Sequence, residues 1–149
     1  MKYQEWLTSV PETITGDTLW KMELYRTALF LGDLAWHDSR KLTKQPQTRS
    51  LADQLFRAVG SISANIAEGY SRSSGKDQAR FYEYSLGSAR ESRDWYFKAR
   101  HVLGTDVTDH RLDLLTQTIR QLLRTIPNSR TKSIREEPVE YGSDRDYDE

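Results

Sequence analysis

The sequence predicts an all-α protein folded as an antiparallel up-down four-helix bundle. Apolar residues recur at helical spacing in four separate segments, whereas no segment shows the apolar–polar alternation of a half-buried strand. The connections between these segments are short, and short connections favour antiparallel neighbours in a bundle. The four helices are expected at residues 17–38, 50–69, 77–104 and 108–127.

Capping residues indicate where these helices begin. Asp17 is a candidate N-cap of the first helix, and Thr108 is a candidate N-cap of the fourth. Ser50 followed by Asp53 resembles a capping box at the start of the second helix. Asp77 lies near the start of the third helix, where an acidic residue complements the helix dipole.

Glycine and proline indicate where the helices end. Gly69 is a candidate C′ residue for the second helix, and Gly104 follows the last apolar position of the third. Pro127 is expected to stop the fourth helix. A polar loop is expected at 41–48, between the first and second helices. The apolar positions of the second helix, which are expected to enter the core, are Leu51, Leu55, Ala58, Val59, Ile62 and Ile66.

Length and composition divide the chain into three parts. A chain of 149 residues suits one domain with a modest core. We expect an N-terminal leader at 1–16, the four-helix bundle at 17–127 and a disordered acidic tail at 128–149, since the tail has no apolar periodicity. The absence of Cys excludes disulfides and thiolate metal sites. Without an apolar signal region or a run of about 20 apolar residues, a cytoplasmic location and no membrane partner are expected.

The zero net charge conceals an uneven distribution. Residues 136–149 hold seven acids against Arg145, a net charge of −6, so residues 1–135 carry +6. A basic body of this kind is compatible with a polyanionic partner, and it is also typical of solvated helix faces.

Two runs of large apolar residues suggest a second buried face. Trp95, Tyr96 and Phe97 span about 200° of the third helix, which exceeds the apolar stripe that one bundle core buries. Residues 29–31 of the first helix are likewise three consecutive large apolar residues, which are too many for one apolar stripe. We therefore expect a homo-oligomer with Phe30 and Phe97 in the interface; the alternative is that both rings are exposed singly.

Residues 61–69, with the sequence SISANIAEG, carry a resemblance to a known family. The segment resembles the S-I-P-x-N-I-A-E-G signature of the four helix bundle protein family, also called 23S rRNA intervening-sequence proteins. Further similarity includes Trp20, residues 51–59 and the run from Arg80 to Glu91, and it extends over 19–126. Ser63 stands at the usual proline, so the second helix is expected to be straighter here.

The resemblance implies a non-enzymatic antiparallel bundle, bacterial, assembled as a homopentamer and often encoded within rRNA intervening sequences. A related set comprises accessory proteins of diversity-generating retroelements, which bind a reverse transcriptase and its template RNA. The structural signature comprises Asn65, Glu68 and Gly69. We expect Asn65 and Glu68 to clamp the second helix to a small-residue stripe at Ser85, Ser88 and Ser92; the alternative is a ligand or catalytic role.

The sequence contains no constellation typical of an enzyme. None of the three histidines follows a Glu by three residues, so a di-iron bundle is excluded. A lone Glu68 without a second carboxylate or a His is a poor acid–base site. We therefore predict no catalytic residue, no cofactor and no metal.

Basic residues are the remaining functional candidates, because Lys and Arg attract phosphates without reading sequence. The protein is predicted to be an oligomeric helical adaptor that binds RNA, a nucleic-acid-processing protein such as a reverse transcriptase, or both. The alternative is a protein–protein scaffold with no nucleic-acid role. The candidate RNA-contacting residues are Arg72, Lys76, Arg80, Arg120, Arg124, Arg130, Lys132 and Arg135.

Overall fold

The computed structural model describes residues 1–131, and over this range the chain forms helices and no strand. The all-α prediction is therefore confirmed for the described range. The predictions for Lys132, Arg135 and the acidic tail lie outside the described residues. The elements are α1 (Tyr3–Ser9), α2 (Glu12–Thr15), the 3₁₀ helix η1 (Thr18–Lys21), α3 (Glu23–Thr43), α4 (Arg49–Tyr70), α5 (Gly75–Lys98), α6 (Arg100–Leu103) and α7 (Thr105–Thr131).

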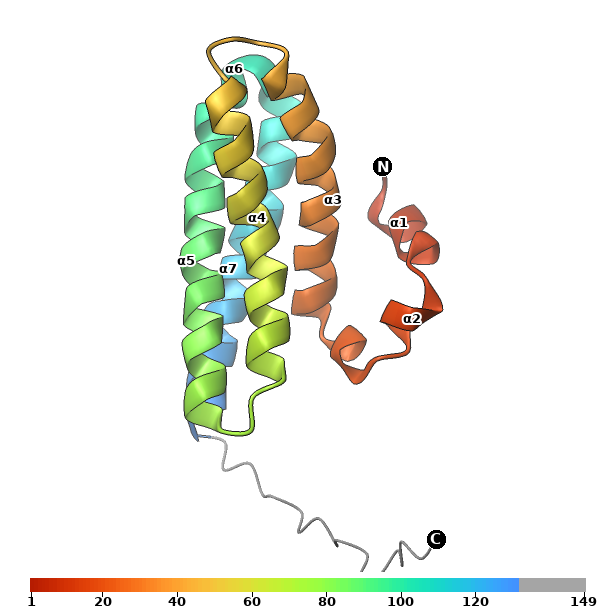
Figure 1. Cartoon of the computed structure of the whole chain (residues 1–149), viewed down its shortest axis with the longest axis vertical. Coiled ribbons are helices and arrows are strands. Elements are labelled where there is room, and N and C mark those ends of the chain that lie inside the picture. Colours follow the sequence, from red (N-terminus) through yellow and green to blue (C-terminus); the bar gives the residue numbers. More distant parts are fainter. Residues whose placement is uncertain (132–149) are drawn as a thin grey trace, which may run out of the picture.

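The long helices α3, α4, α5 and α7 lie side by side in a helical bundle (Figure 1). Helix α4 packs between α3 and α5, and α7 packs on both α5 and α3. The predicted apolar stripe of α4 forms the centre of the core, since Leu55, Val59, Ile62 and Ile66 are fully buried. None of the described helices is long and apolar enough to cross a membrane.

The first long helix begins and ends later than predicted. The side chain of Asp17 does act as a cap, but it accepts the Leu19 amide at 2.9 Å at the start of η1, and α3 begins at Glu23. Helix α3 then continues to Thr43, into the predicted polar loop, because Leu42 is one more buried apolar position. The loop prediction overlooked this residue.

The predicted capping box of the second helix does not form. Helix α4 begins at Arg49 after Thr48, and no side chain caps it. The Thr48 hydroxyl instead donates to the Leu42 carbonyl at 2.6 Å, which closes the α3–α4 turn. Helix α5 begins two residues before Asp77, after Ser74, whose Oγ accepts the Asp77 amide at 3.1 Å.

Two predicted boundaries of the last helix are wrong. Gly104, with φ of +81°, precedes a helix that begins at Thr105, so Thr108 lies inside α7 and is buried. Pro127 does not stop α7, which continues to Thr131, so the segment beyond the bundle begins later than residue 128. Pro127 itself is exposed, and water can solvate the carbonyl that its missing N–H leaves unpaired.

Phe30 is buried within the single chain, contrary to the interface prediction. It is 1% exposed because the N-terminal arm (residues 1–21) covers it, and the rings of Tyr3 and Trp6 lie 5.2 Å from its ring. The Trp6 indole N–H also donates to Asp33 of α3 at 2.6 Å. The second buried face of α3 therefore belongs to an intramolecular contact, and Phe30 is not available to a second copy.

Gly69 lies inside α4 and does not stop it; its role is a close approach of two helices. A Cβ atom at this position would lie 2.7 Å from the buried Tyr82 ring and 3.1 Å from the Gln78 carbonyl oxygen. Only glycine therefore permits α4 and α5 to come this close at their turn.

We predict opposite effects for two Gly→Ala substitutions in α4. Gly69→Ala should lower the free energy of unfolding by about 1–3 kcal/mol, because the packed Tyr82 ring must move. Gly60→Ala should raise it by about 0.5–1 kcal/mol, since nothing lies within 4 Å of its Cβ position and alanine favours the helix. Urea unfolding followed by circular dichroism tests both; equal midpoints for the two variants would contradict the close-approach explanation.

Candidate nucleic-acid interface

Asp38 of α3 is a buried carboxylate at the centre of a polar cluster, with 2% of its surface exposed. Its Oδ2 accepts the Tyr96 hydroxyl at 2.8 Å and the Arg111 Nε at 2.7 Å, and its Oδ1 accepts the Arg111 Nη2 at 3.1 Å. The cluster thus joins α3, α5 and α7. Sequence reasoning missed it, because three separate polar residues give no pattern along the chain.

The protonation states of the cluster fit a structural role. Burial, followed by the Asp38 carboxylate, raises the pKa of Tyr96 well above its ordinary value, so the hydroxyl remains a donor. Burial lowers the pKa of Arg111, but the hydrogen bond to Asp38 and its negative charge outweigh burial, so the pKa is raised. Burial and the Arg111 charge lower the pKa of His110, whose Nδ1 lies 2.7 Å from Arg111 Nη1. The cluster clamps three helices together, and its central carboxylate is shielded from solvent.

The predicted clamp by the signature residues is wrong. The Asn65 amide donates to the Ser61 carbonyl of its own helix at 2.9 Å, and the exposed Glu68 pairs with Arg72 at 2.9 Å. The bond between α4 and α5 comes instead from Ser85, whose hydroxyl donates to the Ile62 carbonyl at 2.9 Å. Ser85 and Ser92 are buried, so the small-residue stripe serves close packing inside the bundle.

The candidate basic residues near the α4–α5 turn are neutralised to a large extent. Arg72 pairs with Glu68, Arg80 with Asp77 at 3.7 Å, and Arg130 of α7 with Glu83 of α5. All of these side chains are substantially exposed, and exposed ion pairs contribute about 0–1 kcal/mol, so a phosphate can compete for the arginines.

An aromatic ring holds two of these arginines in place. The guanidinium carbons of Arg72 and Arg80 lie 4.5 and 5.3 Å from the centre of the Phe81 ring. Tyr84, which is exposed, meets Phe81 edge-on at 5.6 Å. Lys76 also lies at this end of α5, and it has no carboxylate within 4.0 Å among residues 1–131. The turn thus presents cations and aromatic rings together.

Arg120 and Arg124 are exposed on α7, one turn apart. Neither lies within 4.0 Å of a carboxylate in the described part of the chain. Arg124 borders a surface groove with Glu23, Gln121 and Asn128. Of the predicted candidates that lie within residues 1–131, these two and Lys76 are therefore the cations without an ion-pair partner.

The structure adds a basic group that sequence reasoning treated as a polar loop. The side chains of Arg40, Lys41, Lys44 and Arg49 surround the α3–α4 turn, and all four are exposed. Within residues 1–131 none of them lies within 4.0 Å of a carboxylate. The signal was present in the sequence, since no acidic residue occurs between residues 39 and 52.

Exposed aromatic rings lie toward the same end of the bundle. Phe97 of α5 is 53% exposed, so its place in an interface stays a prediction, and the Arg100 guanidinium lies 4.1 Å from its ring centre. Trp36 of α3 and Phe56 of α4 are also exposed, and the centres of their rings lie 5.8 Å apart.

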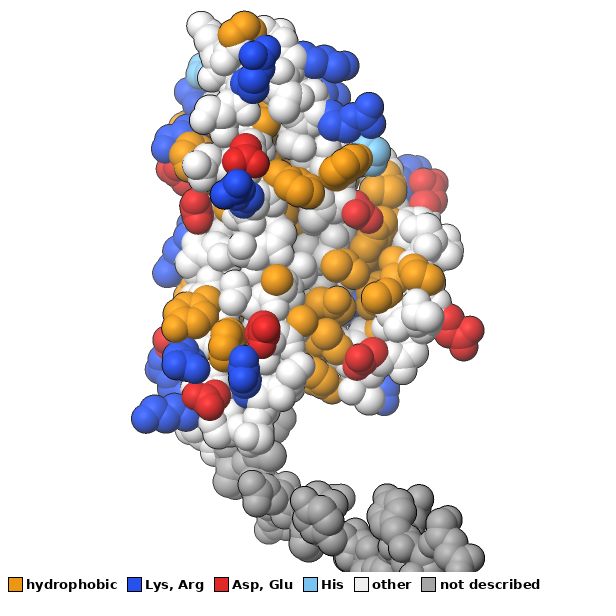
Figure 2. Space-filling view, viewed as in Figure 1, with side chains coloured by type: hydrophobic (Ala, Val, Ile, Leu, Met, Phe, Trp, Pro, Cys, Tyr) orange, Lys and Arg blue, Asp and Glu red, His pale blue; other side chains and the backbone are white. Residues whose placement is uncertain are grey.

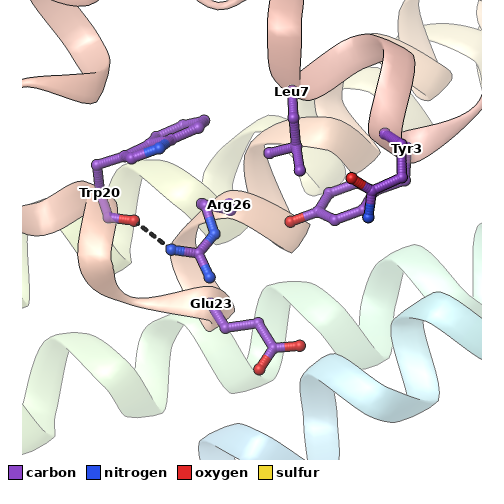
Figure 3. Close-up of a pocket in the computed structure, with 6 residues that line it drawn as sticks. Tyr3, Leu7, Trp20, Glu23 and Arg26 are labelled. Atoms are coloured by element: carbon purple, nitrogen blue, oxygen red, sulfur yellow. Dashed lines mark hydrogen bonds between the residues drawn. The ribbon is translucent and has the colours of Figure 1, made fainter.

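A cleft separates the N-terminal arm from α3 (Figure 3). Tyr3 and Leu7 line it on the α1 side, whereas Glu23 and Arg26 belong to α3. The Arg26 Nη1 donates to the Trp20 carbonyl at 2.7 Å and so ties η1 to the bundle. Among residues 1–131, the cleft included, no group of three or more His, Asp or Glu side chains is placed to hold a metal ion.

The fold and these surfaces define the class: an all-α helical-bundle protein with cations gathered at several exposed places. The family model for the 23S rRNA-intervening sequence protein matches residues 21–128, and the chain belongs to this family. The N-terminal arm lies almost entirely outside the matched range.

One solved structure shows the same fold in another protein. It is a protein of unknown function from the S23 ribosomal protein family of Bacteroides thetaiotaomicron, with a TM-score of 0.65 and 18% sequence identity. The similarity covers 69% of this chain and 97% of that chain. Comparison with curated proteins gives no match.

We predict that the buried cluster behaves as a unit. Arg111→Met should lower the free energy of unfolding by about 3–5 kcal/mol, because it leaves the Asp38 charge buried and unpaired. Adding Asp38→Asn should recover part of this loss, since the double variant buries no charge. A double-mutant cycle by urea unfolding measures the coupling, with Arg120→Met as the exposed control. Additive effects of the two substitutions would show that Asp38 and Arg111 are not coupled.

Proposed function

We propose that the protein is a non-enzymatic helical adaptor that binds RNA, alone or together with a nucleic-acid-processing protein such as a reverse transcriptase. The observation that carries this proposal is the pair Arg120 and Arg124, which are exposed on α7 without a carboxylate within 4.0 Å among residues 1–131. Arginines in this state release counterions from phosphates when they bind, which favours association with RNA.

Two further observations support RNA as the partner. The name of the family refers to an intervening sequence of ribosomal RNA. The arginines stacked on Phe81 offer N–H donors held by a ring, beside an exposed Tyr84 on which a base can stack. The protein–protein scaffold remains the competing function, and the RNA titration below separates the two.

We infer that the working unit is an antiparallel up-down four-helix bundle assembled as a closed homo-oligomer. Short turns join α3 to α4 and α4 to α5, as such a bundle requires. The large exposed ring of Phe97 supports an interface with a second copy. A pentamer is favoured by the resemblance to the family. In a ring, each basic surface repeats in every protomer, so weak phosphate contacts add through multivalency.

The RNA proposal predicts two opposite changes in affinity. Arg120→Glu with Arg124→Glu should weaken binding of labelled single-stranded RNA about tenfold at low salt, with a shallower salt dependence. Removal of residues 136–149 should tighten binding several-fold, because a tethered segment of net charge −6 competes with phosphates. Fluorescence anisotropy at low and moderate salt measures both. If the full-length protein does not bind RNA at low salt, the scaffold function replaces this one.

The oligomer proposal predicts a closed assembly in sedimentation velocity. Phe97→Ser should shift the protein toward the monomer and leave its helicity unchanged, because the ring is 53% exposed and lies outside the hydrophobic core of residues 1–131. Tyr84→Ser is the matched control, since Tyr84 is similarly exposed on the same helix. A monomeric wild-type protein at micromolar concentration would be incompatible with the proposal.

A further inference from the structure

The α3–α4 turn carries four positive charges that form no ion pair within residues 1–131. Arg40, Lys41, Lys44 and Arg49 are exposed, and none of them pairs with a carboxylate within residues 1–131. The α4–α5 turn differs, because its arginines are paired with Glu68 and Asp77. Helix α4 has 22 residues, so these two turns lie about 33 Å apart. The α3–α4 turn is therefore a separate basic surface.

An aromatic pair lies directly beside this surface. Trp36 is 53% exposed and Phe56 is 39% exposed, and their rings meet edge to face at an angle of 63°. Both are too exposed to serve the core alone. Gly60, one turn from Phe56 on α4, has nothing within 4 Å of its Cβ position, so the surface next to the pair is open.

Helix geometry sets the spacing between rings and charges. Arg40 follows Trp36 by four residues and therefore lies on the same face, about 6 Å along the α3 axis. Arg49 precedes Phe56 by seven residues, which places it on the same face of α4, about 10 Å along the axis. Figure 2 shows Lys and Arg side chains gathered at the upper end of this face, with hydrophobic side chains just below them.

The two acids that are nearest to the turn in the sequence of α3 and α4 form ion pairs with other residues. Asp53 lies on α4 between Arg49 and Phe56, but it pairs with Arg57 at 3.3 Å. Asp38 points into the core and is bound by Arg111. Neither acid pairs with a cation of the turn, so the positive charge of the turn can attract an anionic partner.

We propose that this surface is a binding site for single-stranded RNA, with phosphates on the four cations and unpaired bases stacked on Trp36 and Phe56. The inference rests on the RNA-binding function proposed above and gives it a site and a strand preference. Proteins that bind single strands without sequence preference combine a basic track with exposed aromatic rings, because every base has a face that can stack. A duplex cannot use the rings, since its bases are already stacked on each other.

The test uses the full-length protein and a labelled oligouridine of about 12 nucleotides. Lys41→Glu with Lys44→Glu should weaken binding about tenfold at low salt. The matched control is Lys2→Glu with Lys21→Glu, which changes the net charge equally at two exposed lysines of the arm and should have a much smaller effect. Lys41→Gln with Lys44→Gln provides a milder variant, and circular dichroism confirms that each variant is folded.

The aromatic pair has its own readout. Oligouridine should quench part of the tryptophan fluorescence of the wild type, and Trp36→Phe should remove most of that quenching while retaining affinity. Trp36→Ala should weaken binding about tenfold. The same oligouridine annealed to oligoadenosine should bind more weakly than the free strand.

Each contrary result has a distinct meaning. If the wild type binds RNA but the Lys41/Lys44 variants match the arm control, this site is wrong and the proposed RNA function stands. Equal affinity for strand and duplex, or a Trp36→Ala variant that changes the oligomeric state and not the affinity, also overturns the site. A wild type that binds no RNA at low salt overturns both the site and the proposed function.

Discussion

The buried carboxylate of Asp38 is the constraint around which the bundle is arranged. A buried charge without a partner costs several kcal/mol, so α7 must bring Arg111 to it and α5 must bring Tyr96. These contacts set which faces of the helices point outward. Trp36 precedes Asp38 by two residues and lies about 200° around α3, so it faces solvent when Asp38 faces the core. Phe97 follows Tyr96 and turns outward for the same reason.

The parts of the fold that depend on periodicity could be predicted from the sequence. Ile62 and Ile66 are buried as their spacing indicated, because a repeated apolar stripe determines its own helix face. The exact helix ends could not be predicted, since they depend on contacts between distant residues. Gly69 has the position of a helix stop in the sequence, but the structure shows that it is needed for the close approach of the Tyr82 ring. The Thr48 hydroxyl donates to the Leu42 carbonyl and does not cap the helix that follows it.

The sequence predicted that cations would form the candidate site, but it did not predict which of them are already paired with acids. Counting cations identified a basic body, but a count does not reveal that Arg72 and Arg80 already have acidic partners one helical turn or less away. The four cations of the α3–α4 turn are evident in the sequence, but charged residues are common in polar loops, so their presence alone does not predict a binding site. Phe30 shows the converse limit: its partners Tyr3 and Trp6 are more than 20 residues away in the chain, and no local pattern predicts such a contact.

The N-terminal arm extends the hydrophobic core of this protein beyond the residues that the family model matches. The Trp6 ring contacts both Phe30 and Trp20, with ring centres 5.2 and 6.0 Å away, and the family match begins only at residue 21. The outer face of a bundle helix is usually polar, but on α3 this face carries Phe30, and the arm keeps its ring out of water. The burial of Phe30 therefore depends on the arm: without Tyr3 and Trp6 the phenylalanine ring would face water, unless another molecule covered it.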